Sequence, residues 1–193
     1  MHELKTAISI AAVSLTLVGY IPYFRDIFKG KTEPHVYTWF IWGLVTAIAF
    51  GLQVSAGAGV GSWVTGVVAV VAFAICGLGL RNGKKNITKI DTLFLFLAFV
   101  ALFLWLVVKQ PVISVILVSS IDMLGFAPTI RKSWHKPHTE TLFTYELNAF
   151  RHTISIFALE NYSIVTWLYP GSWALANAIF SVMLIIRRKQ LQS

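Results

Sequence analysis

The amino-acid sequence predicts an all-α membrane protein whose seven transmembrane helices form two parallel triple-helix bundles joined by a linking helix. Hydrophobic residues make up 56% of the 193 residues and charged residues only 12%, whereas charged residues account for about a quarter of an ordinary soluble domain. The chain also contains seven apolar runs of spanning length, and one stretch occurs twice. These observations exclude an ordinary soluble domain.

The seven apolar runs predict the positions of the helices. A spanning helix needs about 20 mostly apolar residues, because backbone polar groups find no water in the hydrocarbon and must pair within the segment. We expect helices at residues 4–24, 36–55, 62–80, 91–108, 112–130, 141–159 and 164–186. The glycine-rich residues 55–62 (SAGAGVGS) predict a tight turn between the second and third helices. The first run is too long for a signal-peptide core and lacks a cleavage site, so we expect it to be retained.

Lysine and arginine residues predict the orientation, because cytoplasmic loops are enriched in them. Thirteen of these residues lie in the loops after the first, third and fifth helices and in the C-terminal tail, whereas only Lys5 and Lys109 lie on the opposite side. This bias places the N-terminus outside and the C-terminus in the cytoplasm of a plasma or inner membrane. It also accounts for the net charge of +8 without a nucleic-acid partner. The lipid bilayer is the expected surrounding of this multi-pass protein.

The repeated stretch comprises residues 19–42 and 125–148, which align without a gap at an offset of 106. Each copy closes one apolar run and opens the next, which indicates a duplication. The identical positions are Gly19 and Gly125, Pro22 and Pro128, Arg25 and Arg131, and Thr38 and Thr144. The duplication divides the chain into a first triple-helix bundle at residues 1–86, a linking helix at 87–110 and a second triple-helix bundle at 111–193. A single linking helix gives both bundles the same orientation.

This arrangement resembles the PQ-loop superfamily, which includes the SWEET sugar transporters, the lysosomal amino-acid exporters and the KDEL receptor. The resemblance rests on the three-plus-one-plus-three order, on Pro22 and Pro128 near the cytoplasmic ends of two helices, and on the basic loop after each. The glutamine that names the motif is replaced by Tyr23 and Thr129. The second and sixth helices lack the interior prolines that complete a four-proline hinge in SWEETs. The resemblance implies that Pro22 and Pro128 are gating hinges and that Asn177 contacts the solute.

Two of these implied roles have simpler alternatives. A proline near the membrane surface can merely end a helix, which is the alternative for Pro22 and Pro128. An asparagine within an apolar helix can form an amide hydrogen bond to a neighbouring helix, which is the alternative for Asn177.

The sixth expected helix is unusually polar. A polar stripe within a membrane faces either a cavity or another helix. The presence of Glu146, Arg151 and His152 within seven residues favours a cavity. Five polar residues recur at spacings of 4, 3, 4 and 3 and so share one face of that helix: Thr141, Tyr145, Asn148, His152 and Ser155.

Asp122 and Arg151 are expected at the same depth, near the middle of the membrane. An unpaired charge costs at least about 3 kcal/mol there, so we expect an ion pair with a structural or gating role. The alternative for Asp122 is a contact with a nearby serine or a backbone group. The pair leaves Glu146 and His152 as groups that can exchange protons, and either could couple a proton to the solute.

The remaining candidate residues are amides and aromatic side chains. Asn148 and Asn177 are amides placed within apolar helices and are expected to line one central cavity. The rings of Trp42 and Trp173 can stack on a sugar or another flat solute. The predicted substrate-binding residues are therefore Asn177, Asn148, Tyr145, Trp42 and Trp173.

The sequence favours transport over catalysis. It contains no Ser-His-Asp spacing, phosphate loop or pair of metal ligands, so we expect no enzyme, cofactor or metal. The first hypothesis is a small transporter that moves a polar solute, such as a sugar, an amino acid or a related metabolite, by alternating access. A receptor or sensor of the KDEL-receptor type and a subunit of a membrane complex are the alternatives. Short loops offer little surface for signalling, which favours transport, and homo-oligomerisation stays open.

The orientation can be tested with a reporter fused after Ser193. Because the positive loops are expected on the cytoplasmic side, a reporter that is active only in the cytoplasm should be active in this fusion. The measurement is reporter activity in intact cells. Activity of an outside-only reporter at the same position would overturn the predicted topology.

Overall fold

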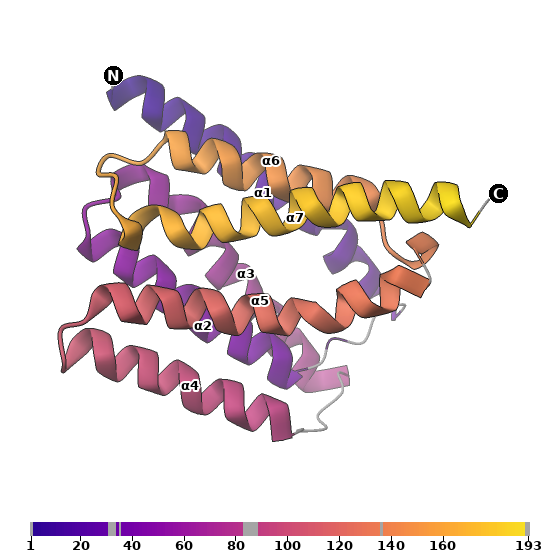
Figure 1. Cartoon of the computed structure of the whole chain (residues 1–193), viewed down its shortest axis with the longest axis horizontal. Coiled ribbons are helices and arrows are strands. Elements are labelled where there is room, and N and C mark those ends of the chain that lie inside the picture. The colour runs from indigo at the N-terminus through magenta and orange to yellow at the C-terminus, as the bar shows by residue number, and fades with distance from the viewer. Residues whose placement is uncertain (1, 31–33, 35, 83–88, 136, 192–193) are drawn as a thin grey trace.

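Long α-helices make up most of the computed structural model, which describes residues 2–30, 34, 36–82, 89–135 and 137–191 (Figure 1). The α-helices in these residues are α1 (His2–Phe28), α2 (Val36–Ser55), α3 (Trp63–Asn82), α4 (Lys89–Leu106), α5 (Pro111–His135), α6 (Leu142–Phe157) and α7 (Ile164–Gln190). Two short 3-10 helices, η1 (Gly59–Ser62) and η2 (Pro137–Thr139), precede α3 and α6. The described residues contain no strand, so the all-α class is confirmed.

The observed helices follow the apolar runs of the sequence closely. Helix α2 begins and ends at the expected residues, and α4 differs from the expected range by two residues at each end. Helices α1 and α7 continue beyond their apolar runs and end in basic turns, with Arg25 in α1 and Arg187, Arg188 and Lys189 in α7. Positive charge is favourable at the C-terminal end of a helix dipole, so these turns stay helical after the hydrophobic pattern stops.

Within the described residues, five helices are long and apolar enough to cross a membrane, which indicates a multi-pass membrane protein. They are α1, α2, η1 with α3 (Gly59–Leu80), α4 and α7. The apolar part of α5, Pro111–Phe126, is shorter, and α6 has 16 residues.

The helix directions and contacts divide the chain into two similar halves. Helices α1, α3, α5 and α7 run one way, and α2, α4 and α6 run the other way (Figure 1). Helix α3 packs against both α1 and α2, and α7 packs against both α5 and α6. Besides a contact between α2 and α7, the N-terminal half (α1 to α3) meets the C-terminal half (α5 to α7) in two places, through α1 against α6 and through α2 against α5. These two contacts are equivalent when the halves are exchanged, and α4 packs outside them against α2 and α5.

The two ends of the bundle differ in charge. The basic end is the end at which α1, α3, α5 and α7 finish, and it carries Arg25, Lys29, Arg187, Arg188 and Lys189. The opposite end carries the loop between α2 and α3 and the loop between α6 and α7 (Figure 1).

These two loops hold the halves together at the opposite end, and we call their contact the loop lock (residues 56–62 and 158–163). The backbone N–H of Glu160 donates to the carbonyl of Ala58 at 3.0 Å. The side-chain amide of Asn161 donates to the carbonyl of Ala56 at 2.8 Å. Both hydrogen bonds join one half to the other.

Gly61 lets the two loops approach closely. A Cβ atom added at Gly61 would lie 2.7 Å from both the backbone N and the Cα of Leu159, which is too close for any side chain. The Leu159 carbonyl accepts a hydrogen bond from Lys5 Nζ at 2.6 Å, so α1 is tied to the same loop. The absence of a side chain at Gly61 is therefore a requirement of the loop lock.

A proline creates a further link between the halves. Pro170 lies inside α7 and has no N–H, so the carbonyl four residues earlier, at Thr166, lacks its usual helical donor. The side-chain amide of Gln53 in α2 donates to this carbonyl at 2.8 Å. Both residues are fully buried. The proline thus frees an acceptor that the other half uses.

Gly61→Ala should destabilise the loop lock, because the added methyl meets backbone atoms that cannot move independently. We expect a loss of about 1 to 3 kcal/mol, the usual cost of overpacking. Thermal unfolding of the purified protein measures it. Gly77→Ala in α3 is the matched control, since a Cβ atom there meets nothing within 4 Å. Equal unfolding temperatures for the two variants would show that the close approach is not needed.

Candidate functional site

A cavity of about 390 Å³ lies between the two halves. Six helices line it, and α4 contributes nothing among the described residues. Its volume lies within the range of small-molecule sites, about 300 to 1,000 Å³. Near the basic end the lining includes Tyr23, Trp39 and Glu140, whereas no described residue of the loop lock takes part. The cavity therefore extends toward the basic end and is closed at the opposite end.

The sequence repeat maps onto the two sides of this cavity. Five pairs of residues at the offset of 106 line it together, and the last pair extends the aligned stretch by four residues. The pairs are Tyr20 and Phe126, Tyr23 and Thr129, Trp39 and Tyr145, Trp42 and Asn148, and Thr46 and His152. A site at the interface of two repeats is the usual location of the solute site in repeat-built transporters.

The N-terminal half contributes an aromatic wall. The rings of Tyr23 and Trp39 lie 5.3 Å apart, and Trp39 meets Trp42 edge to face at the same separation. The Nε1 atom of Trp39 also donates to the hydroxyl of Tyr23 at 3.2 Å. Contacts of this kind stabilise the packing of the rings and fix the orientation of each ring.

The C-terminal half contributes a second group of rings. Phe126 lies 5.9 Å from Trp173 and 6.1 Å from Tyr145, measured between ring centroids. The hydroxyl of Tyr145 donates to Glu140 Oε2 at 2.6 Å. The ring of Tyr145 is therefore held in place at both ends.

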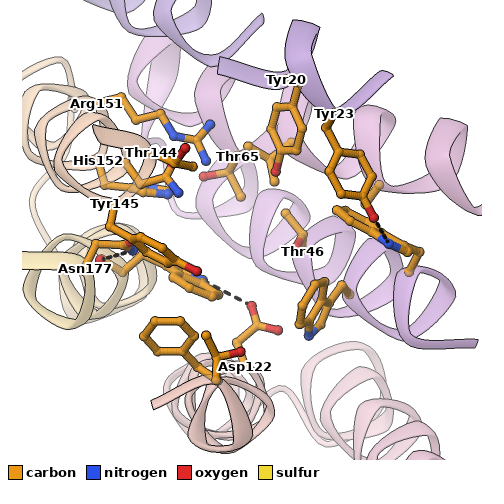
Figure 2. A pocket seen from close by; sticks show the side chains of 18 of the residues that line it. Tyr20, Tyr23, Thr46, Thr65, Asp122, Thr144, Tyr145, Arg151, His152 and Asn177 are labelled. Atoms are coloured by element: carbon orange, nitrogen blue, oxygen red, sulfur yellow. Dashed lines mark hydrogen bonds between the residues drawn. The ribbon is translucent and has the colours of Figure 1, made fainter. Parts of the chain in front are cut away.

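Asp122 is a buried acid in the lining of the cavity (Figure 2). It belongs to a chain of hydrogen bonds. Its Oδ2 atom accepts from the hydroxyl of Tyr169 at 2.5 Å and from Nε1 of Trp173 at 3.2 Å. The Tyr169 oxygen lies 2.9 Å from the hydroxyl of Thr46, which must donate because Tyr169 gives its own proton to Asp122. This chain joins α5 and α7 to α2, across the two halves. The Oδ1 atom of Asp122 has no hydrogen-bond partner among the described residues.

Arg151 and His152 are the other buried polar groups of the cavity. Arg151 is only 4% exposed, and its guanidinium lies 5.7 Å from the ring centroid of Tyr20 (Figure 2). Its Nε and Nη1 atoms have no hydrogen-bond partner in the described part of the chain. The ring of His152 stacks on Trp173 with centroids 6.3 Å apart, and its Nδ1 atom is also unpartnered there. Three buried polar side chains with unsatisfied atoms thus line one cavity.

The ion pair expected between Asp122 and Arg151 is absent from the structure. Within the described residues Asp122 bonds to Tyr169 and Trp173, whereas Arg151 lies over Tyr20 and forms no ion pair. The two residues line the same cavity but face different helices. Counting residues along a helix estimates depth, but it does not give the direction in which a side chain points.

The other candidate residues fall into three groups. Asn148 lines the cavity with no hydrogen bond in the described part of the chain, and Asn177 lines it while its Nδ2 atom donates to the Trp173 carbonyl at 2.7 Å. Tyr145, Trp42 and Trp173 line the cavity as well. Glu146 does not: it is exposed on the outer surface of α6. Thr141 extends the polar stripe along the lining, while Ser155 bonds within its own helix.

One of the two proposed hinge prolines, Pro22, lies outside the cavity lining. Pro22 lies inside α1, which continues as a helix to Phe28, and its side chain is exposed. Pro128 falls within the range of α5, and its side chain lies outside the described part of the chain.

Among the residues that sequence reasoning missed, Tyr169, Thr46 and Tyr20 contact the buried polar groups of the site. For two of them a signal was present, because Tyr20 and Thr46 lie at the repeat offset from Phe126 and His152. Tyr169 has no such signal, since a tyrosine near the end of a spanning helix is usually an interfacial anchor.

Tyr169→Phe tests the hydrogen-bond chain at Asp122. Removing the hydroxyl takes one donor from Asp122 and strands the buried hydroxyl of Thr46, so we expect a loss of about 1 to 3 kcal/mol of stability. Thermal unfolding in detergent measures this loss. Tyr162→Phe is the control, because the hydroxyl of Tyr162 makes one hydrogen bond to Ile156 at an exposed position. An unchanged Tyr169→Phe protein would show that the chain does not hold the halves together.

No protein-family model matches this chain. No curated protein and no solved structure matches it either. A function for the chain therefore rests on the geometry of the cavity.

Proposed function

We propose that this protein is a small membrane transporter that moves a polar solute by alternating access, with its two halves rocking around the central cavity. The observation that carries the proposal is the cavity itself. It lies between two halves with equivalent helix contacts, extends toward the basic end and is closed at the other end by the loop lock. Rigid-body motion of repeats around a fixed site is a general mechanism of such transporters.

In this proposal α5 and α6 complete seven spanning helices, with the basic end in the cytoplasm. Helix α6 is short and polar, but its outer side exposes, besides Glu146 about one turn from the basic end of the helix, three phenylalanines at intervals of seven residues: Phe143, Phe150 and Phe157. Its cavity face carries Asn148 and His152. A helix with one lipid-facing side and one cavity-facing side suits a spanning position beside a hydrated solute site.

The hydrogen bonds of the loop lock and those beside it together have the strength that a transporter gate needs. Four hydrogen bonds join the halves near the opposite end, with donors Glu160, Asn161, Gln53 and Lys5. A protein hydrogen bond contributes about 0.5 to 1.5 kcal/mol net, so together they contribute roughly 2 to 6 kcal/mol. Differential binding of a solute can shift a two-state equilibrium by this amount. Pro22 and Pro128 remain the proposed hinges, and Pro170 adds a third proline beside the lock.

If transport is coupled to a proton, the placement of the two candidate groups favours His152. His152 lies in the cavity, where a solute can contact it. Glu146 is exposed on the far side of the same helix. A group that exchanges protons in step with the solute needs access to the same cavity.

A reversible disulfide tests whether the loop lock opens during transport. A Cβ atom at Gly57 would lie 3.7 Å from the Cβ of Asn161, a usual separation for a disulfide. The double variant Gly57→Cys and Asn161→Cys is made in a Cys76→Ala background. Oxidation should abolish the flux of labelled sugars, amino acids or carboxylates in proteoliposomes, because the halves can no longer separate. Reduction should restore the flux.

The single-cysteine variants are the controls and should transport equally in oxidant and reductant. Gly57→Cys also shows the cost of a side chain at a φ of 75°, a left-handed conformation that favours glycine. Undiminished flux with the cross-link fully formed would rule out opening at this end. Binding of a solute without any flux in the uncross-linked protein would favour a receptor instead.

A further inference from the structure

The cavity contains a buried arginine whose charge is neutralised by no acid among the described residues of the lining. Two carboxyl side chains lie in this described lining, and each is engaged elsewhere. Asp122 accepts from Tyr169 and Trp173, and Glu140 accepts from Tyr145. Arg151 forms neither an ion pair nor a hydrogen bond with the described residues.

This arrangement is unfavourable when the cavity is empty. A guanidinium stays protonated at any physiological pH, and a buried charge without a partner loses hydration that nothing replaces. The ring of Tyr20 offsets part of this cost through its contact with the guanidinium. The cavity gives an outside partner access to this charge, and an anion is the partner that would neutralise it.

The surroundings of Arg151 indicate what kind of anion fits. Arg151 is the only lysine or arginine among the described residues of the lining, so a single negative charge is matched and a doubly charged phosphate is not. The aromatic walls around Trp42 and Trp173 favour an organic body over an inorganic ion. The unpartnered Oδ1 atom of Asp122 in the same cavity can accept a hydrogen bond from a ligand.

We propose that the cavity binds a small organic carboxylate that also carries a hydroxyl or amino group. The carboxylate binds the guanidinium of Arg151, whose planar set of N–H donors matches carboxylate oxygens. The hydroxyl or amino group donates to Asp122, and the body of the ligand lies between the aromatic walls. This assignment rests on the proposed function, because it takes the cavity to be the solute site.

The test uses matched ligands on the purified protein in detergent. The probes are phenylacetate, mandelate and phenylalanine, each compared with its primary amide, and inorganic phosphate. Binding is followed by tryptophan fluorescence, since Trp39, Trp42 and Trp173 line the cavity. We expect mandelate or phenylalanine to bind about tenfold to a hundredfold more tightly than its amide, as hydrogen bonds to a charged group predict. Phenylacetate should bind more weakly than whichever of mandelate and phenylalanine binds more tightly, because it has no hydroxyl or amino group to donate to Asp122.

Arg151→Gln should abolish the preference for carboxylate over amide while leaving the affinity for the amide unchanged. Its ligand-free unfolding temperature should equal or exceed that of the wild type, because the substitution removes an unpaired charge and strands no partner. Arg151→Lys should keep part of the preference, since it retains the charge without the planar donor set. Arg25→Gln is the control and should change nothing, because Arg25 pairs with Asp26 outside the cavity.

Three results would overturn the proposal. The first is that no carboxylate binds more tightly than its amide, and the second is that Arg151→Gln leaves the preference intact. The third is that phosphate binds more tightly than every carboxylate, which would assign an inorganic anion. If phenylacetate binds as tightly as both mandelate and phenylalanine, Asp122 does not contact the ligand, and that part of the proposal is contradicted. Binding is measured without any movement of the loops, so this inference and the disulfide test of transport can fail separately.

Discussion

Polar groups inside an apolar helix bundle must find partners, and this requirement organises the rest of the structure. Most of them do so within the chain: Gln53 donates to the carbonyl that Pro170 leaves free, and Tyr169 connects Asp122 to the other half. Eight buried side-chain atoms have no partner among the described residues, and four of them line the cavity, on Asp122, Arg151 and His152. The other four are Gln53 Oε1 and three serine hydroxyls outside the lining. An acid, a guanidinium and an imidazole with unsatisfied atoms in one cavity are the pattern expected of a site whose ligand supplies the missing partners.

The duplication explains why the cavity lies between the two halves. The residues that differ between the two copies explain the chemistry of the cavity. Equivalent positions of the two copies face each other, but Trp42 corresponds to Asn148 and Thr46 to His152. Asp122 lies at the same offset from Thr16, which bonds only to a carbonyl of its own helix. Among the described residues of the lining, both halves therefore provide rings, whereas only the C-terminal half provides charges. A symmetric frame has become an asymmetric site, and such a site can distinguish the two ends of a solute.

The sequence alone predicted most of the helices and part of the site, and the limits have a physical cause. An apolar run marks where a spanning helix lies, and the expected starts of α2 and α7 therefore agree with the observed ones, Val36 and Ile164. The 3.6-residue period placed Asn148 and His152 on one face. The expected depth of Asp122 and Arg151 did not show which way their side chains point, because successive residues of a helix are rotated by about 100° around its axis. The same rotation carries Glu146 away from its neighbour Tyr145, which faces the cavity. The role of Tyr169 depends on contacts between segments that are far apart in the sequence, and no local sequence pattern predicts such contacts.

The unpaired arginine also bears on how the proposed rocking motion is controlled. Closing the cavity at the basic end would enclose Arg151 without a counter-ion, while breaking the loop lock would remove hydrogen bonds at the opposite end. An empty carrier faces both costs at once, because a stranded charge in a membrane protein is expensive. A bound carboxylate removes the first cost, so that only the loop lock opposes the change of state. In the proposed mechanism the loaded protein therefore changes state more readily than the empty one, and this difference favours exchange of solutes over net leakage.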